Sequence, residues 1–266
     1  MSSRSNKTRL DELLVQLGHA TDVDAAARLV MAGRVKLSGS DAAAVLTPGM
    51  RVSSDAEVTV AETPRFVSRG GLKLERGLDE FEIDVTGMVA LDLGASTGGF
   101  TDCLLQRGAI RVYAVDSGRA QLHAQLVADP RVISMERTNA RKGFTLPEKV
   151  QVIVADLSFI SLLAVLPRNM EHLEPGGHCI ALLKPQFEAE RREVPRGGVI
   201  EDAATVDAIV ARFRQNAAAL GLEITGIVES PIRGDRGNRE FLVRIVRTEP
   251  RCQLRVSSIE FKFRCD

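Results

Sequence analysis

The sequence predicts an α/β protein in which a Rossmann-like sheet of about seven strands follows a small N-terminal α+β domain. Its 266 residues are enough for two unequal domains. The stretch TPRFVSRGG, residues 63–71, places a proline and paired glycines between periodic segments. After it, β-branched apolar runs alternate with helical patterns, which is typical of a doubly wound sheet. We expect a first domain at 1–62, a linker at 63–71, a second domain at 72–247 and a tail without assigned role at 248–266.

The first domain begins with leucines at the spacing of one helix face, and Thr21 is a candidate N-cap for the helix that follows. Turn-rich stretches then separate two short apolar runs, which we interpret as strands. The expected helices are 9–17 and 22–31, and the expected strands are 34–37 and 57–60.

The second domain is expected to contain seven strands, most of them joined by helices. Its last two strands are separated by SPIRGDRGNR, whose glycines and proline favour a turn, so this pair is expected to be antiparallel. The expected strands are 89–93, 112–116, 132–134, 150–155, 178–183, 223–229 and 241–246, and the expected helices are 98–107, 121–126, 160–170 and 203–220.

Composition excludes several classes of protein. Equal numbers of basic and acidic residues, 35 each, give no overall charge that would indicate a polyanionic partner. Aromatic residues are 4% and tryptophan is absent, which argues against a broad surface for stacking bases. The four cysteines lie far apart and form no CxxC pair, so we expect neither a metal site nor disulfides. No apolar run approaches the roughly 18 residues that span a bilayer, and no secretory signal is visible; a cytoplasmic protein without membrane insertion is expected.

The most informative stretch is ALDLGASTGGFTDCLL, which has the pattern of a strand, a glycine-rich turn and the start of a helix. Gly94, Gly98 and Gly99 permit tight turns and close approach of a ligand to the backbone. Asp116 ends the next expected strand, where a carboxylate accepts hydrogen bonds from ribose hydroxyls. Nicotinamide, flavin and S-adenosylmethionine proteins share these features.

Two details favour S-adenosylmethionine as the cofactor. Asp92 lies just before the loop, where an acid would repel a pyrophosphate but would suit an amino group and a sulfonium. The loop also has the spacing GxSxGG instead of the dinucleotide pattern GxGxxG. A dinucleotide site and a purely structural turn are the alternatives.

Several further motifs occur in order: SRGGLKL, VYAVDSG, ADLSFISL, ALLKPQFE and GNREF. With the glycine loop, they resemble the TlyA family of ribose methyltransferases, whose catalytic domain is similar to the FtsJ fold. The segment TRLDELLVQLGHATDVDAAARLVMAGRVKLSG resembles the S-four-type RNA-binding module. Together the resemblance covers about residues 5–247 and implies a Rossmann-like methyltransferase sheet, with S-adenosylmethionine as methyl donor. It further implies methyl transfer to a 2′-hydroxyl, of cytidine, in ribosomal RNA.

The resemblance also implies a catalytic tetrad and a set of cofactor contacts. The tetrad positions are occupied by Lys73, Asp156, Lys184 and Glu240. Besides Asp92, the cofactor positions are occupied by Gly94, Ser96, Gly98, Gly99, Phe100, Asp116 and Asn139.

A ribose hydroxyl is a poor nucleophile, so an enzyme must take its proton and align its oxygen with the methyl group. A lysine serves as the acceptor only where burial or a second cation tunes it, and a lysine pair with acidic neighbours permits this. We expect Lys184 nearest the hydroxyl, Asp156 orienting it, and Lys73 with Glu240 completing the network. Alternatively, an acid after a strand caps the next helix, and Lys184 is a solvated loop lysine.

The expected partner is ribosomal RNA or a ribosomal subunit, although the first domain is not basic overall. Phosphate contacts of its cations would fix the register of the protein on a folded RNA. A solvated helix face is the alternative interpretation. The candidate RNA-binding residues are Arg4, Lys7, Arg9, Arg28, Arg34, Lys36, Arg65 and Arg69.

Two other functions remain open at this stage. The family often carries a haemolysin label, so a membrane-active protein is one alternative, although no cationic amphipathic helix supports it. A non-catalytic RNA-binding factor for ribosome assembly is the other, against which the complete tetrad argues. The oligomeric state is left open by the sequence.

Overall fold

The computed structural model describes residues 7–38, 46–61 and 64–247. The chain divides into two compact units, Met1–Pro64 and Arg65–Asp266. Residues after Pro64 that were expected in a linker belong to the second unit, and Gly70 begins helix α3, Gly70–Glu80. Arg4 and the predicted tail at 248–266 lie outside the described residues.

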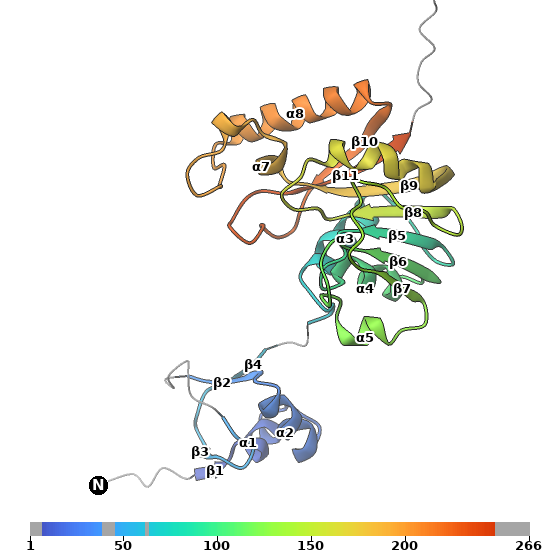
Figure 1. Ribbon diagram of the computed structural model, residues 1–266. Coiled ribbons are helices and arrows are strands. Elements are labelled where there is room, and N and C mark those ends of the chain that lie inside the picture. The colour runs from blue at the N-terminus through green and yellow to red at the C-terminus, as the bar shows by residue number, and fades with distance from the viewer. Residues whose placement is uncertain (1–6, 39–45, 62–63, 248–266) are drawn as a thin grey trace, which may run out of the picture. The chain divides into compact units, whose positions relative to one another are not determined.

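The described residues of the first unit form two small antiparallel sheets and two helices (Figure 1). Both predicted helices and both predicted strands are present. Two further strands, Lys7–Arg9 and Arg51–Ser53, were not predicted because their mostly polar residues form no apolar run. Asp22, and not Thr21, caps α2: its side chain accepts a hydrogen bond from the Ala25 N–H at 2.7 Å. The elements are β1 Lys7–Arg9, α1 Leu10–Gln16, α2 Val23–Met31, β2 Val35–Leu37, β3 Arg51–Ser53 and β4 Val58–Val60, with β1 paired to β3 and β2 to β4.

The second unit is built on one seven-stranded sheet in the order β10-β11-β9-β8-β5-β6-β7. Neighbours from β9 to β7 are parallel, while β11 is antiparallel to both β9 and β10. This confirms the predicted α/β class and the antiparallel final pair. The strands are β5 Val89–Leu93, β6 Arg111–Val115, β7 Val132–Met135, β8 Val150–Ala155, β9 Leu173–Leu183, β10 Leu222–Glu229 and β11 Phe241–Arg247.

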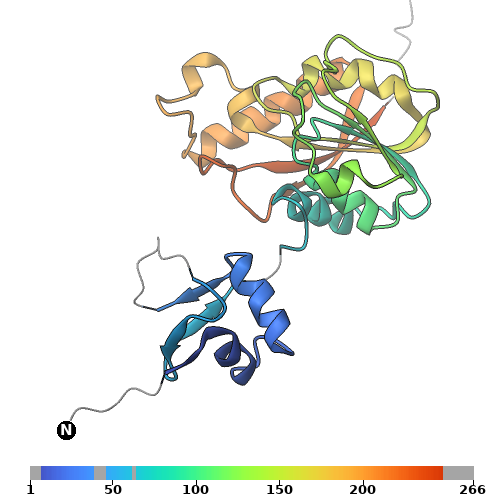
Figure 2. The same ribbon diagram turned by 60° about the horizontal axis from the view of Figure 1, so that its bottom comes forward.

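Helices cover both faces of this sheet (Figures 1 and 2). Because successive strand residues point to opposite faces, Leu91 packs with α8 on one side and Ala90 packs with α3 and α4 on the other. The helices after α3 are α4 Gly99–Gln106, α5 Ala124–Val127, α6 Leu166–Asn169, α7 Pro185–Glu188 and α8 Ala203–Ala219, with 3-10 turns η1 Leu162–Ala164, η2 Met170–His172 and η3 Arg191–Glu193.

The predicted helix at 160–170 is broken into η1, α6 and η2. Ser161 caps η1 by accepting a hydrogen bond from the Leu163 N–H, and Pro167, which lacks an N–H, lies in the first turn of α6. The apolar spacing therefore marked the buried side of this segment correctly but not its backbone conformation.

The strand ends bring the motif residues to one edge of the sheet. Leu93 pairs with Val115 and with Ala155, so the residues that follow β5, β6 and β8 emerge together. Phe241 at the start of β11 pairs with Leu183 at the end of β9, because these strands are antiparallel. Residues before β11 therefore share this edge with residues after the parallel strands.

Candidate active site

The glycine loop lies between β5 and α4 and is fixed against the end of β8. Gly94 has φ +85°, and a Cβ atom there would lie 2.5 Å from the carbonyl oxygen of Asp156. Gly98 has φ +96° and is the N-cap of α4, packed against Leu122 and Leu126. These two glycines are needed for backbone conformation and close packing.

Asp116 holds the loop from the neighbouring strand. Its Oδ2 accepts a hydrogen bond from the Ser96 N–H at 2.9 Å, and its Oδ1 accepts one from the Gly118 N–H at 2.6 Å. Ser96 itself has φ +48°, so this bond stabilises an unfavourable backbone conformation. Asp116 and Asn139 line a cavity of about 450 Å³ that also includes Gly94 and Ser96.

This cavity fits the adenosine half of S-adenosylmethionine. A side chain at Gly94 would collide with the wall, so only a glycine leaves room for a ligand close to the loop backbone. The Asp116 carboxylate at the end of β6 has the position and chemistry that suit ribose hydroxyls. Gly94 and Ser96, together with Gly99 and Phe100, also line a second, adjoining cavity.

Asp92 differs from its neighbours in the motif. It is 0% exposed, and its Oδ2 accepts a hydrogen bond from Thr101 Oγ1 at 2.6 Å. Burial raises the pKa of Asp92 to about 7. Although Asp92 is one of the expected cofactor residues, it shares the Ala90 face of β5, beneath α4, and lines neither cavity.

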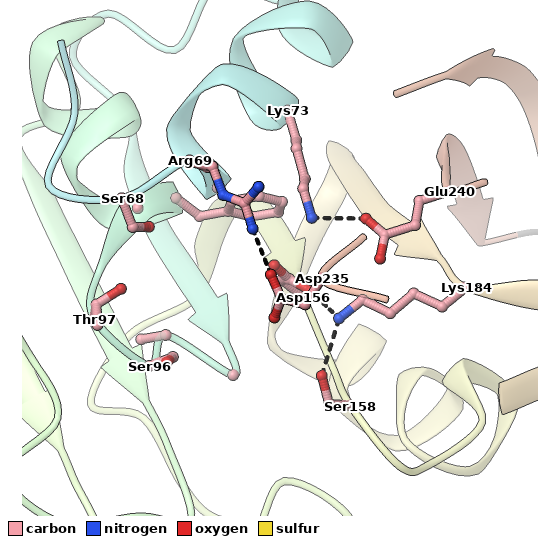
Figure 3. A pocket seen from close by; sticks show the side chains of 15 residues that line it. Ser68, Arg69, Lys73, Ser96, Thr97, Asp156, Ser158, Lys184, Asp235 and Glu240 are labelled. Atoms are coloured by element: carbon pink, nitrogen blue, oxygen red, sulfur yellow. Dashed lines mark hydrogen bonds and ion pairs between the residues drawn. The ribbon is translucent and has the colours of Figure 1, made fainter. Parts of the chain in front are cut away.

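The adjoining cavity, of about 270 Å³, contains all four residues of the predicted tetrad as two ion pairs (Figure 3). Lys73 Nζ from α3 lies 2.6 Å from Glu240 Oε2. Lys184 Nζ lies 2.7 Å from Asp156 Oδ1 and donates a hydrogen bond to Ser158 Oγ at 3.0 Å. Residues far apart in the sequence thus meet at the sheet edge.

These ion pairs are poorly accessible to water. The side chains of Lys184 and Lys73 are only 10% and 12% exposed, and that of Glu240 is 4% exposed. Asp156 is the most accessible member at 24%. Electrostatic interactions are stronger where water is excluded, so small displacements of these groups change their energies appreciably. The interpretation of Lys184 as a solvated loop lysine is therefore wrong.

A third cavity, of about 230 Å³, lies on the other side of Lys184 and Glu240. Phe159 is 85% exposed with φ +64°, and its ring centroid lies 5.2 Å from that of Phe187. A left-handed backbone at phenylalanine costs free energy, and such conformations cluster at functional sites. This cavity offers aromatic surface next to the lysine, despite the scarcity of aromatic residues in the chain.

Sequence reasoning missed several residues that line these cavities. Ser158 lines all three, yet only its position two residues after Asp156 could have singled it out. Asp235 forms an ion pair with Arg69 across the 270 Å³ cavity (Figure 3), and it lies in a loop whose motif indicated only a turn. Phe159 belongs to the ADLSF motif but is not among the predicted site residues.

The candidate RNA-binding cations fall into two groups. Arg65 and Arg69 belong to the second unit and are paired with Glu75 and Asp235. In the first unit, Arg9 binds Asp11 through two hydrogen bonds and Arg34 contacts the Ala61 carbonyl. Lys7 on β1, Arg28 on α2 and Lys36 on β2 are exposed, as is Arg9.

Within the described ranges, no group of three or more His, Cys, Asp or Glu residues is arranged to hold a metal ion. Within the same ranges, no helix combines the length and apolar character needed to cross a membrane.

Comparisons with known proteins identify the second unit. The model of the FtsJ-like methyltransferase family matches residues 66–247. The "Putative rRNA methyltransferase YqxC" of Bacillus subtilis is 44% identical over 91% of this chain and 86% of its own length. The 16S/23S rRNA (cytidine-2'-O)-methyltransferase TlyA of Mycobacterium tuberculosis is 41% identical, covering 90% of each chain.

A solved structure is similar over nearly the whole chain. The "Putative hemolysin from Streptococcus thermophilus" is 39% identical, covers 92% of this chain and 90% of its own, and has a TM-score of 0.68. Since the family model matches well over half of the chain and the relatives exceed 30% identity, this chain belongs to the FtsJ-like methyltransferase family.

Proposed function

We propose that this protein is a cytoplasmic enzyme that transfers a methyl group from S-adenosylmethionine to the 2′-hydroxyl of a cytidine in ribosomal RNA. The observation that carries the proposal is the Lys73, Asp156, Lys184 and Glu240 cluster, held at the sheet edge beside the glycine-loop cavity. We infer ribosomal RNA as the substrate class from the names of the relatives in B. subtilis and M. tuberculosis, and cytidine as the nucleoside from the name of the latter.

When bound, S-adenosylmethionine supplies a methyl group that its sulfonium charge has already made electrophilic. The remaining task is to place the hydroxyl oxygen in line with that methyl and to accept its proton. Lys184 Nζ, once it has lost its own proton, would accept the hydroxyl proton as the ribose oxygen bonds to the methyl carbon. The carbon–sulfur bond would break at the same time, and its electron pair would stay on the sulfur of the departing thioether. Asp156 and Ser158, at 2.7 and 3.0 Å, fix the direction of that nitrogen and stabilise the ammonium that results.

Lys73 and Glu240 have a different task in this proposal. Their 2.6 Å ion pair is nearly closed to water and spans from α3 to the start of β11. It would hold the two walls of the cavity at the spacing that a ribose needs, with Lys73 available to its oxygens. The cavity lined by Phe159 and Phe187 would then receive the attached base.

The first unit would bind the folded RNA as an S-four-type module. Lys7, Arg28 and Lys36 are exposed there and suit phosphate groups, contacts to which fix position without reading sequence. Such contacts add affinity that weakens with salt, whereas chemistry is confined to the second unit.

The test is methyl transfer by the purified protein from labelled S-adenosylmethionine to ribosomal subunits, followed by digestion of the RNA to nucleosides. Label in 2′-O-methylcytidine is the expected result. Label in a base-methylated nucleoside would contradict the proposed 2′-O-ribose transfer. Tight RNA binding without S-adenosylmethionine binding would instead indicate a non-catalytic assembly factor. Dye release from liposomes at physiological salt would indicate a membrane-active protein.

A further inference from the structure

Glu188 connects the two chain segments that carry Lys184 and Asp156, and the mechanism above makes no use of it. It ends α7, the short helix that starts directly after Lys184. Its Oε2 accepts a hydrogen bond from Ser161 Oγ at 2.5 Å, and its Oε1 accepts one from the Leu162 N–H at 2.7 Å.

Ser161 and Leu162 close the segment that follows β8. That segment starts at Asp156 and includes Ser158. The side chains of these two residues contact Lys184 Nζ. The contacts therefore form a ring: from Lys184 to Asp156, along the chain to Ser161, across to Glu188, and back through α7. A lysine side chain has four rotatable bonds, so the place of Nζ depends on the groups around it, and the ring fixes those groups.

Two features show that holding these segments together has a cost in free energy. Burial raises the pKa of Glu188 above its ordinary value, opposed by the Ser161 and Leu162 hydrogen bonds. A buried carboxyl group costs free energy unless it is hydrogen-bonded, so Glu188 depends on its bonds to Ser161 and Leu162 to remain in this place. Phe159, in the same segment, is held at φ +64°, a conformation that persists only when its surroundings impose it.

We propose that Glu188 is a positioning residue for methyl transfer, which holds the 156–162 segment against α7 so that Lys184 Nζ stays directed by Asp156 and Ser158. The inference rests on the proposed function for its catalytic consequence. Its geometric consequence, the confinement of Lys184, does not depend on that function.

Three variants separate the role from general stability. Glu188→Ala removes both hydrogen bonds. Glu188→Gln keeps an acceptor for the Leu162 N–H and an amide that can donate to the Ser161 hydroxyl, so it is the conservative control. Ser161→Ala removes one of the two Glu188 bonds, together with the Leu163 cap of η1, and leaves the carboxylate with its Leu162 N–H partner. It is the variant to use if Glu188→Ala does not fold.

The first readout is the rate at which an acylating reagent modifies each lysine amine, followed by mass spectrometry on the full chain. In Glu188→Ala, or in Ser161→Ala if that is the variant that folds, modification of Lys184 should rise several-fold. Lys73, which is paired with Glu240 on the other side of the cavity, should be unchanged and is the internal control. Glu188→Gln should match the wild-type protein. Unchanged modification of Lys184 in a folded variant would overturn the inference.

The second readout is the kinetics of methyl transfer. Misplacement of a reacting group by about 1 Å costs on the order of 100-fold in rate, so kcat of Glu188→Ala should fall by about 10- to 100-fold. KM for RNA should change by less than about twofold, because no RNA contact is removed, and Glu188→Gln should restore kcat. Ser161→Ala should add little to Glu188→Ala, since both cut the same link. Exposed Lys184 with unchanged kcat would refute the positioning role, whereas absence of transfer by the wild-type protein would refute the proposed function alone.

Discussion

The two units differ in how they hold their positive charges. Lys36 and Arg28 in the first unit are exposed, on short elements around a small core. Lys73 and Lys184 in the second unit are nearly buried, each within 2.7 Å of a carboxylate, on the edge of a sheet with two extensive cores. Exposed charges act over a distance and are screened by salt, whereas buried pairs are screened little. The first arrangement suits attraction of a polyanion, and the second suits control of one proton.

The largest expected effect is loss of chemistry on removal of Lys184. Lys184→Ala should lower the single-turnover rate by about 1000-fold or more, because both proton acceptance and alignment are lost. S-adenosylmethionine affinity, measured by calorimetry, should change by less than about threefold. Lys36→Ala removes the same charge from the first unit and should keep the wild-type rate at saturating RNA. A wild-type rate in Lys184→Ala would refute the assignment.

The glycine loop gives the next effect. Gly94→Ala brings a Cβ atom to 2.5 Å from the Asp156 carbonyl in a left-handed conformation, so S-adenosylmethionine should bind at least about tenfold more weakly by calorimetry. Gly87→Ala is the matched control, since Gly87 also has positive φ but nothing within 4 Å. It should lose about 1 kcal/mol of stability and no cofactor affinity. Equal affinities in the two variants would exclude a role of the loop in cofactor binding.

Replacement of exposed cations in the first unit should weaken RNA binding without changing the rate of the chemical step. The double variant Arg28→Ala with Lys36→Ala should raise KM for RNA by about tenfold with kcat unchanged, and should reduce the salt slope of log affinity by about one for each lost phosphate contact. Arg131→Ala, which breaks an ion pair with Asp129, is the control in the second unit. An unaltered salt slope in the double variant would favour a solvated helix face.

The last prediction concerns the stability of the second unit, and not its binding or catalysis, and it is made for the buried acid Asp92. Burial raises the pKa of Asp92 from 3.8 to about 7, so the folded state binds a proton more tightly than the unfolded state does. This contribution to stability is present at low pH and is lost as pH rises from about 4 to about 7, by at most about 4 kcal/mol. Urea unfolding of Asp92→Asn at several pH values should lack this contribution. Parallel curves for wild type and Asp92→Asn would show that Asp92 stays ionised when buried.

Much of the second unit was predictable because its signals are local and periodic. Apolar runs located β5 and β8 at their observed bounds. Residues that follow parallel strands meet at one edge of the sheet, independently of where the connecting helices begin and end. The meeting of Asp156 with Lys184 follows from that geometry. The place of Glu240 at the same edge depends on β11 being antiparallel to its neighbours, which the predicted final hairpin had indicated.

The rest depended on information that spacing does not contain. Asp92 and Asp116 have the same strand parity, since Asp92 pairs with Ala114, but Asp92 lies within β5 and is buried, whereas Asp116 follows the end of β6 and lines a cavity. The strained Phe159 and the link from Glu188 to Ser161 depend on side chains brought together over many residues. In the first unit, β1 and β3 consist mostly of polar residues and gave no apolar signal, whereas β2 and β4, of the same length, did.

The central claim, ribose methylation of a ribosomal cytidine at the Lys184 cluster, is tested most directly by mapping 2′-O-methylated nucleotides in ribosomal RNA. The comparison is between cells with the wild-type protein and cells in which Lys184→Ala replaces it. We predict that one or a few methylated cytidines are lost in the variant while all other sites persist. An identical map in the two strains would contradict the claim.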